Sequence, residues 1–244
     1  MTQFMSQGTA PLSPPPLSHL AFETRAGLEF GMLMASLPLL RWSKRGDGHP
    51  VLVLPGFTAG DVSTLALRRF LRGQGHHVHG WRLGANTGPS DDILSGLQSR
   101  FEELFERHQQ KISLVGWSLG GIYAREIARA FPSKVRQVIS LASPFQDPMA
   151  NNIPFLASAA AAGLSQNESL LKQLRRPLNV PSTAVYTRSD GIVNWRSCIE
   201  TDGPLRENVR VWSSHCGLGH HPMTLHVIAD RLAQEEGQWK PYRF

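Results

Sequence analysis

Residues 114–121 read LVGWSLGG and place a serine between small residues directly after an apolar run. The letters KISLVG leading into it predict a buried strand, and LGGIYAREIARAF after it predicts a helix that ends before Pro132. Within this stretch, GWSLG fits the pattern G-x-S-x-G, whose glycines let the backbone turn sharply between a strand and a helix. Such a turn holds the side chain clear of the backbone, so we predict that Ser118 is a nucleophile. The pattern alone also fits an ordinary Gly-rich loop, and the choice depends on partner residues elsewhere.

Strand-like and helix-like segments alternate along most of the chain. Short apolar runs typical of strands occur at 51–55, 77–81, 111–116, 135–143, 183–190 and 208–215. Helical stretches occur at 26–40, 63–75, 93–108 and 119–131, and a last one begins at about Pro222. The strict alternation of strands and helices predicts the α/β class, with a mostly parallel central sheet covered by helices on both faces.

Length and composition are those of one globular domain, which we expect over residues 21–244. Hydrophobic residues make up 41% of the 244 residues and charged residues 18%, which is ordinary for a soluble protein. The formal charge of +6 comes from scattered lysines and arginines, which favours a solvated basic surface over a nucleic-acid site. Cys198 and Cys216 supply neither a disulfide framework nor a Cys-rich metal pattern, so one bridge and two buried free thiols both stay open.

The N-terminal region predicts a tail followed by an apolar helix. Residues 1–20 lack the features of a secretory signal, and the prolines at 14–16 indicate a flexible tail. The segment 26–40 is apolar but short and contains Glu29 and Pro38, so we expect a buried or surface-lying helix rather than a membrane span. With neither an export signal nor a span, we expect a cytoplasmic location, with peripheral contact to a lipid surface as a further possibility.

A nucleophilic serine needs a histidine to take its proton and a carboxylate to fix the tautomer of that histidine. Asp190 follows the strand-like TAVYT, and the carboxyl end of a parallel strand after the nucleophile is where such an acid lies. An Asp-Gly pair is by itself ordinary turn chemistry. The alternative acid is Asp202, although no strand precedes it. We therefore predict Asp190 as the acid.

The base should come after the acid, and WSSHCGLGHHPMTLHV offers four histidines. His215 follows the strand-like NVRVW almost at once, so its ring can lie over the sheet edge. His226 falls within the last helix, and His220 and His221 adjoin Pro222, where they would help to open that helix. We predict His215 as the base, with His220 as the alternative.

Attack on a carbonyl creates an oxyanion, which backbone N–H groups must stabilise. Leu119, the residue after the nucleophile, supplies one such donor in this geometry. The second should come from the loop after an early strand, and PGFTAG at 55–60 is such a loop. Gly56 permits close approach there, so we predict Phe57 as the donor and Thr58 as the alternate. This chemistry requires no metal and no cofactor.

With VLVLPGF, GWSLGG, YTRSDGIV and SSHCGLG in this order, the chain resembles the α/β-hydrolase superfamily and, within it, the compact bacterial lipase and esterase branch. The resemblance covers about residues 46–236. It implies a mostly parallel sheet of eight or slightly fewer strands and a triad of Ser118, Asp190 and His215. One departure is the oxyanion turn, where many lipases have His-Gly and this chain has Pro-Gly.

The family often inserts a lid after the sixth strand, and the stretch 143–178 is the longest that the sheet does not need. Pro154, Phe155, Leu156 and the alanine run fit a small apolar lid that favours lipid-like acyl chains. An amphipathic helix packed against the rest of the domain would account for the same residues equally well.

Together these features predict hydrolysis of small-molecule carboxylic esters with an apolar acyl group, through an acyl-enzyme. Acyl transfer and thioester cleavage by the same three residues are the alternatives within catalysis, because the fold does not fix the acceptor. A non-catalytic protein that binds a lipid or a partner on the same fold is the alternative from another class.

Overall fold

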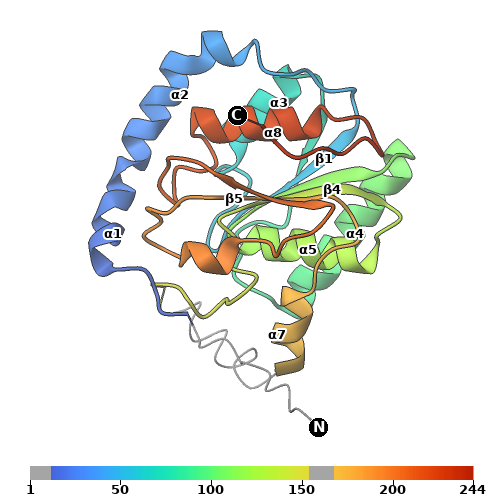
Figure 1. Cartoon of the computed structure of the whole chain (residues 1–244). Coiled ribbons are helices and arrows are strands. Elements are labelled where there is room, and N and C mark those ends of the chain that lie inside the picture. The colour runs from blue at the N-terminus through green and yellow to red at the C-terminus, as the bar shows by residue number, and fades with distance from the viewer. Residues whose placement is uncertain (1–11, 154–167, 244) are drawn as a thin grey trace.

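A computed structural model describes residues 12–153 and 168–243, and its centre is a sheet of six parallel strands (Figure 1). The strands are β1 (Pro50–Leu54), β2 (His77–Gly80), β3 (Ile112–Trp117), β4 (Val135–Leu141), β5 (Ser182–Tyr186) and β6 (Arg206–Arg210), in the spatial order β2-β1-β3-β4-β5-β6. The helices are α1 (Leu17–Phe22), α2 (Ala26–Leu40), α3 (Leu65–Gly73), α4 (Asp91–His108), α5 (Leu119–Ala130), α7 (Glu168–Arg175) and α8 (Pro222–Leu232), with 3-10 turns η1 (Glu23–Arg25) and η2 (Trp195–Cys198). The predicted α/β class is confirmed.

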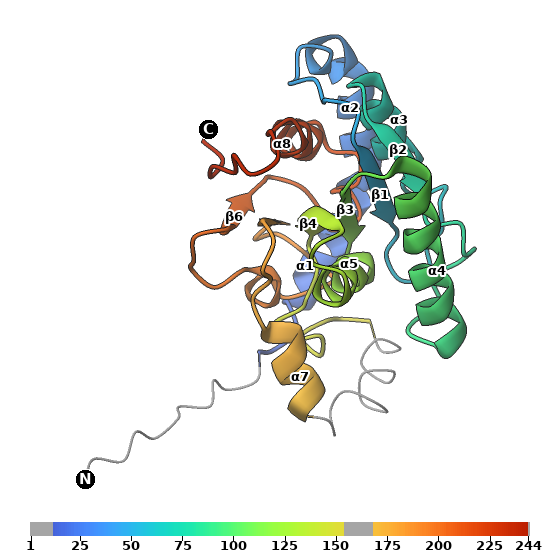
Figure 2. The same cartoon turned by 90° about the vertical axis from the view of Figure 1, so that its right-hand side faces the viewer.

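Side chains alternate along each strand and build one apolar core on each face of the sheet. On β1, Leu52 and Leu54 enter the core that α4 and α5 cover. Val51 and Val53 enter the opposite core, which α2, α3 and α8 cover. Figure 2 shows α4 and α5 on one side of the sheet and α3 and α8 on the other. Burial on both faces explains why these strands are continuous apolar runs in the sequence.

Parallel strands bring the loops that follow them to one edge of the sheet. The register pairs Leu54 of β1 with Gly116 of β3, Gly116 with Ser140 of β4, and Ser140 with Ala184 of β5. The four strands therefore end side by side. The loops after β1, β3, β5 and β6, which carry the predicted site residues, meet at this carboxyl edge.

The N-terminal segment, expected as a flexible tail over residues 1–20, is described from residue 12 onward. Residues 1–11 lie outside the described part, but the Pro15 carbonyl accepts a hydrogen bond from the Asn152 side chain at 3.0 Å, and α1 begins at Leu17. Prolines have no N–H of their own to satisfy, so an extended Pro-rich segment can lie on a protein and offer its carbonyls to side-chain donors.

Helix α2 covers residues 26–40, for which a buried or surface-lying helix was predicted, and it lies on the surface with one side buried. Its Glu29, Leu33 and Leu40 are buried, whereas Leu28 and Leu39 on its other side are exposed. Among the helices in the described ranges, none combines the length and the apolar character needed to cross a bilayer.

The lid predicted over 143–178 falls partly outside the described residues, which stop at 153 and resume at 168. Its two described ends pack on the body, because Phe145 and Leu174 are buried in the core with α4 and α5. The lid itself stays a prediction.

Candidate active site

Ser118 lies in the turn between β3 and α5 with a backbone conformation that non-glycine residues rarely adopt. Its φ is 52° and its ψ is −120°, a strain of about 1–3 kcal/mol that neighbouring structure must sustain. The Ser118 N–H donates to the Leu141 carbonyl at 2.8 Å, and its carbonyl accepts from the Gly121 N–H at 3.0 Å. Leu119 opens α5, and the first N–H groups of a helix have no carbonyl partner within it. The oxyanion role of Leu119 stays a prediction.

The two glycines of the G-x-S-x-G pattern are required by close backbone packing. A Cβ on Gly116 would collide with the backbone of Gly120, and a Cβ on Gly120 would collide with the carbonyl of Leu54. Backbone atoms cannot rotate away as a flexible side chain can, so any larger residue would push β1, β3 and α5 apart. These contacts explain why the turn needs glycine on both sides of Ser118.

Asp190 and His215, which are far apart in the sequence, form a hydrogen-bonded pair at this edge. The Nδ1 of His215 lies 2.8 Å from Oδ2 of Asp190, and both side chains are buried. The other carboxylate oxygen, Oδ1, accepts from the N–H groups of Ile192 and Val193, each at 2.8 Å. Because both oxygens of Asp190 are committed, the carboxylate is fixed and holds the imidazole with Nε2 directed away from it.

The surroundings of His215 stabilise its charged form. Burial by itself would lower the pKa of His215, but the charge and hydrogen bond of Asp190 and the charge of Glu23 raise this pKa above its ordinary value of 6.5. A base that takes a proton from a serine becomes an imidazolium, and these two carboxylates favour that state. Before the reaction the ring must be neutral, so catalysis by His215 would increase as the pH rises through the raised pKa.

The alternative residues considered from the sequence have other partners. His220 Nε2 lies 2.9 Å from the Ala26 carbonyl, and His221 caps the start of α8 as expected. His226 is exposed within α8, and Asp202 is exposed in the loop before β6. The ring that contacts Asp190 belongs to His215.

The Ser118 turn and the His215 loop are joined through Trp117. The indole Nε1–H of Trp117 donates to the His215 carbonyl at 3.1 Å. Gly219 packs against the indole, where a Cβ would lie 2.6 Å from the ring. Within the described residues, no hydrogen bond joins the Ser118 hydroxyl to the His215 ring; such a bond often tightens only when substrate is bound. Trp117 therefore fixes the histidine loop beside the end of β3.

The loop after β1 approaches Ser118 as the sequence predicted for an oxyanion loop. A Cβ on Gly56 would lie 3.3 Å from the Ser118 Cβ. The Thr58 N–H already donates to the Asn86 carbonyl at 2.7 Å. The amide of Thr58 is therefore used within the protein, and the oxyanion role of Phe57 stays a prediction.

Asn86 is a buried brace of this loop that no sequence motif identified. Its side-chain nitrogen donates to the Pro55 carbonyl at 3.0 Å, and its Oδ1 accepts from the Tyr123 hydroxyl at 3.3 Å. Burial raises the pKa of Tyr123 well above its ordinary range, so the hydroxyl stays a donor. The only sequence signal was the position of Asn86 in a Gly-rich loop after β2.

Glu23, in η1, ties the loop of the acid to the loop of the base. Its Oε1 accepts from the N–H groups of Gly191 at 2.8 Å and His215 at 3.0 Å, and its Oε2 accepts from the Cys216 N–H at 2.8 Å. One carboxylate thus fixes the backbone beside both Asp190 and His215. Cys216 is an exposed free thiol rather than a buried one or half of a disulfide.

Arg25 and Glu29 add a second and a third tie from the same segment. One guanidinium nitrogen of Arg25 donates to Ser189 Oγ and to the Ser213 carbonyl, both at 2.7 Å. The carboxylate of Glu29 accepts from the N–H of Ser214 at 2.7 Å and from its hydroxyl at 2.6 Å. A lone carboxylate, Glu29, in the otherwise apolar stretch 26–40 was the one sequence signal of this arrangement.

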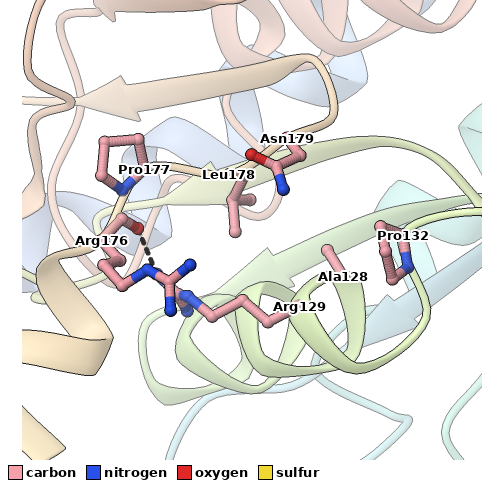
Figure 3. Close-up of a pocket in the computed structure, with 7 residues that line it drawn as sticks. All are labelled: Ala128, Arg129, Pro132, Arg176, Pro177, Leu178 and Asn179. Carbon is pink, nitrogen blue, oxygen red and sulfur yellow. Dashed lines mark hydrogen bonds between the residues drawn. The ribbon is translucent and has the colours of Figure 1, made fainter.

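Two cavities lie away from these residues. The smaller, of about 90 Å³, is lined by Ala128, Arg129, Pro132, Arg176, Pro177, Leu178 and Asn179 (Figure 3). It lies at the far end of α5, about 15 Å along the helix from Ser118. The larger, of about 580 Å³, is lined in part by Gln146, Arg175 and Glu200. Neither cavity is lined by Ser118, so neither is assigned to the substrate.

Asp47, His49 and His76 form a group of potential metal ligands at the opposite, amino edge of the sheet. Their ligand atoms lie within 4.8 Å of one another. Asp47 already pairs with Arg136 at 2.8 Å, and His49 Nε2 lies 2.8 Å from Ser113 Oγ. Burial lowers the pKa of His49 to about 4, so its ring stays neutral. With a guanidinium on its only carboxylate, this group fits a structural hydrogen-bond network.

No family model and no curated protein matches the chain. It is similar in structure to one of the metagenome-derived lipolytic enzymes LipS and LipT, with 19% identity over 78% of this chain and 93% of that chain and a TM-score of 0.57. Lipase B of Aspergillus fumigatus gives 15% identity over 78% and 53%, with a TM-score of 0.56. The N-formylmaleamic acid deformylase of Pseudomonas putida S16 gives 16% over 76% and 94%, with a TM-score of 0.53. The chain therefore has the α/β-hydrolase fold.

Proposed function

We propose that this protein is a serine hydrolase that cleaves carboxylic esters. The observation that carries the proposal is the buried hydrogen bond between Asp190 and His215, at the sheet edge where the β3–α5 turn presents Ser118. The neighbours named as lipolytic enzyme and lipase support an ester with an apolar acyl group as the substrate.

In this mechanism the Ser118 oxygen attacks the ester carbonyl while Nε2 of His215 takes the hydroxyl proton. Asp190 holds the ring and stabilises its positive charge. The N–H groups of Phe57 and Leu119 stabilise the oxyanion. His215 then protonates the departing alcohol, which leaves an acyl group on Ser118. A water molecule, deprotonated by His215, attacks the acyl-enzyme and releases the carboxylic acid.

Acyl transfer and thioester cleavage use the same residues and differ only in the acceptor or the leaving group. A panel of 4-nitrophenyl esters of increasing acyl length, assayed beside matched acyl thioesters and with and without an added alcohol, separates these reactions. We expect ester turnover that increases with acyl length and releases free acid. Faster thioester turnover would favour thioester cleavage, and a new ester formed from the alcohol would favour transfer. Binding of the esters without any turnover would contradict catalysis.

Glu23→Gln is expected to weaken catalysis and to change its pH dependence. The glutamine oxygen can still accept from the N–H groups of Gly191 and His215, but the NH₂ group cannot accept from the Cys216 N–H, so the loop of His215 loses a tie and kcat should fall by about 10-fold. The charge of Glu23 raises the pKa of His215. Its removal should therefore shift the acidic limb of the kcat/KM profile to lower pH, measured on the best ester of the panel.

Glu235→Gln is the matched control, because it removes the same charge from an exposed position after α8. It should leave both kcat and the pH profile unchanged. An unshifted acidic limb in Glu23→Gln would contradict the effect of the Glu23 charge on His215, and an unchanged kcat with normal thermal unfolding would contradict its positioning role.

A further inference from the structure

The outward surface of α1 and α2 is apolar along its length. Leu28 and Leu39 are each 75% exposed, and Trp42, directly after α2, is 87% exposed. The other large exposed apolar residues here are Leu17, Leu20, Phe22, Phe30, Met32, Met34 and Leu37. Exposed apolar residues that gather in one continuous patch mark an interaction surface, whereas single scattered ones do not. We call residues 17–45 the N-terminal arm.

The few charged side chains within the two helices and η1 do not face outward. From residue 17 to residue 40 the sequence has three, namely Glu23, Arg25 and Glu29. All three bond the loops that carry Asp190 and His215. The outer side of the N-terminal arm is thus left without Asp, Glu, Lys or Arg over these residues, and a helix that is apolar nearly all round needs an apolar environment.

Cations gather where the apolar part of the arm ends. Arg41, Lys44 and Arg45 are exposed around Trp42, and Lys44 also pairs with Asp230. A tryptophan among cations is typical of the headgroup level of a membrane, where the indole ring lies in the interface and the cations meet anionic lipids. The formal charge of +6 also favours attraction to an anionic lipid surface.

The N-terminal arm also lies beside the candidate active site. Figure 1 shows α1 and α2 along one side of the molecule, and the contacts of Glu23 place this side against the loops of Asp190 and His215. Trp212, between β6 and His215, is also exposed on the loop that carries His215. A surface that takes up the arm would therefore meet the carboxyl edge of the sheet.

We propose that the N-terminal arm docks on an anionic lipid surface and presents the active-site loops to it. Docking rests on the exposed residues of the arm alone. Its consequence, that the substrate is an ester held in that surface, rests on the proposed function.

A second copy of the chain is the competing occupant of this surface. A Cβ built on Gly27 or Gly31 would meet no atom within 4 Å, so another helix could approach closely there. Two copies would, however, bring two charges of +6 together, whereas anionic headgroups would neutralise the cations around Trp42. The charge therefore favours a lipid surface.

The test measures vesicle binding of the Ser118→Ala protein by flotation, so the result does not depend on hydrolysis. Vesicles of phosphatidylcholine alone are compared with vesicles that also contain phosphatidylglycerol. We expect binding to the anionic vesicles about tenfold tighter than to the neutral ones. Adding Leu28→Gln, Met32→Gln and Leu39→Gln should weaken this binding by at least about tenfold.

Leu94→Gln is the matched control, because Leu94 is 47% exposed on α4, across the sheet from α2. It should bind vesicles as the parent does. If the triple variant fails to fold by thermal unfolding, Leu28→Gln alone and the pair Arg41→Gln with Arg45→Gln replace it, each expected to weaken binding several-fold.

Two outcomes would overturn the proposal. The first is absent binding, or binding that the variants of the N-terminal arm leave unchanged. The second is a dimer, measured by light scattering across protein concentration, that the triple variant abolishes; it would assign the surface to a second copy. Ester turnover by the wild type in solution, beside absent vesicle binding by the Ser118→Ala protein, would separate failure of docking from failure of the proposed function.

Discussion

Ser118→Ala should abolish ester turnover and covalent labelling by a fluorophosphonate probe. Without the hydroxyl no acyl-enzyme can form, and what remains is the small rate enhancement from substrate binding and oxyanion stabilisation. We expect kcat to fall by about four to six orders of magnitude. The measurement is turnover of the best ester of the panel, together with gel fluorescence after labelling of purified protein.

Ser143→Ala is the matched control for this loss. Ser143 lies just after β4 at the same edge of the sheet, and its hydroxyl donates only to the Leu141 carbonyl, at 3.3 Å. This variant should be labelled and should turn over ester as the wild type does. Labelling of Ser118→Ala equal to that of the wild type would show that another residue is the nucleophile.

The Ser118 turn could be predicted from the sequence because the physical requirement for it is local. Gly116 and Gly120 lie within two residues of Ser118, and each is needed by a backbone contact that excludes a Cβ. The continuous apolar strands were equally recognisable, because a sheet covered on both faces demands apolar side chains in both directions.

The hydrogen bonds that position the site could not be predicted in the same way. Glu23 and the His215 N–H that it accepts from are 192 residues apart. A single polar contact over such a separation leaves no periodicity in the sequence, and Glu23 and Asn86 belong to no motif. Composition does not decide the state of residues 12–20 for a related reason, since a Pro-rich segment in solution and one laid on a protein can have the same sequence.

The choice of the base lies between a local motif, which the sequence shows, and a long-range contact, which it does not. His215, His220 and His221 lie within seven residues, and the sequence could rank them only by their distance from the preceding strand and from Pro222. The fold separates them by their partners, because His220 lies against the Ala26 carbonyl and His221 caps α8. Which of several nearby imidazoles meets the acid is decided by long-range packing.

Asp190→Asn should lower kcat by about 10⁴-fold while the fold stays intact. The asparagine keeps an oxygen that can accept from the N–H groups of Ile192 and Val193, as Oδ1 does now. Its NH₂ group would face Nδ1 of His215, which would then have to be an acceptor. That tautomer carries its proton on Nε2, so the ring cannot take one from Ser118.

The same substitution should move two pH profiles in directions that the charge of Asp190 fixes. This charge raises the pKa of His215, so the acidic limb of the residual kcat/KM should shift to lower pH in Asp190→Asn. A raised pKa stabilises the folded protein below 6.5, the ordinary histidine value, and this contribution is lost as the pH rises through the raised pKa. The stability advantage of the wild type over the variant in thermal unfolding should therefore shrink as the pH rises.

Asp202→Asn separates this assignment from the alternative acid, because it makes the same change at an exposed position before β6. We expect wild-type turnover and an unshifted acidic limb from it. Full activity in Asp190→Asn together with inactivity in Asp202→Asn would reverse the assignment. The buried hydrogen bond of 2.8 Å between Asp190 and His215 argues for the opposite result, since a carboxylate that contacts no imidazole can neither hold the ring of the base nor stabilise its charge.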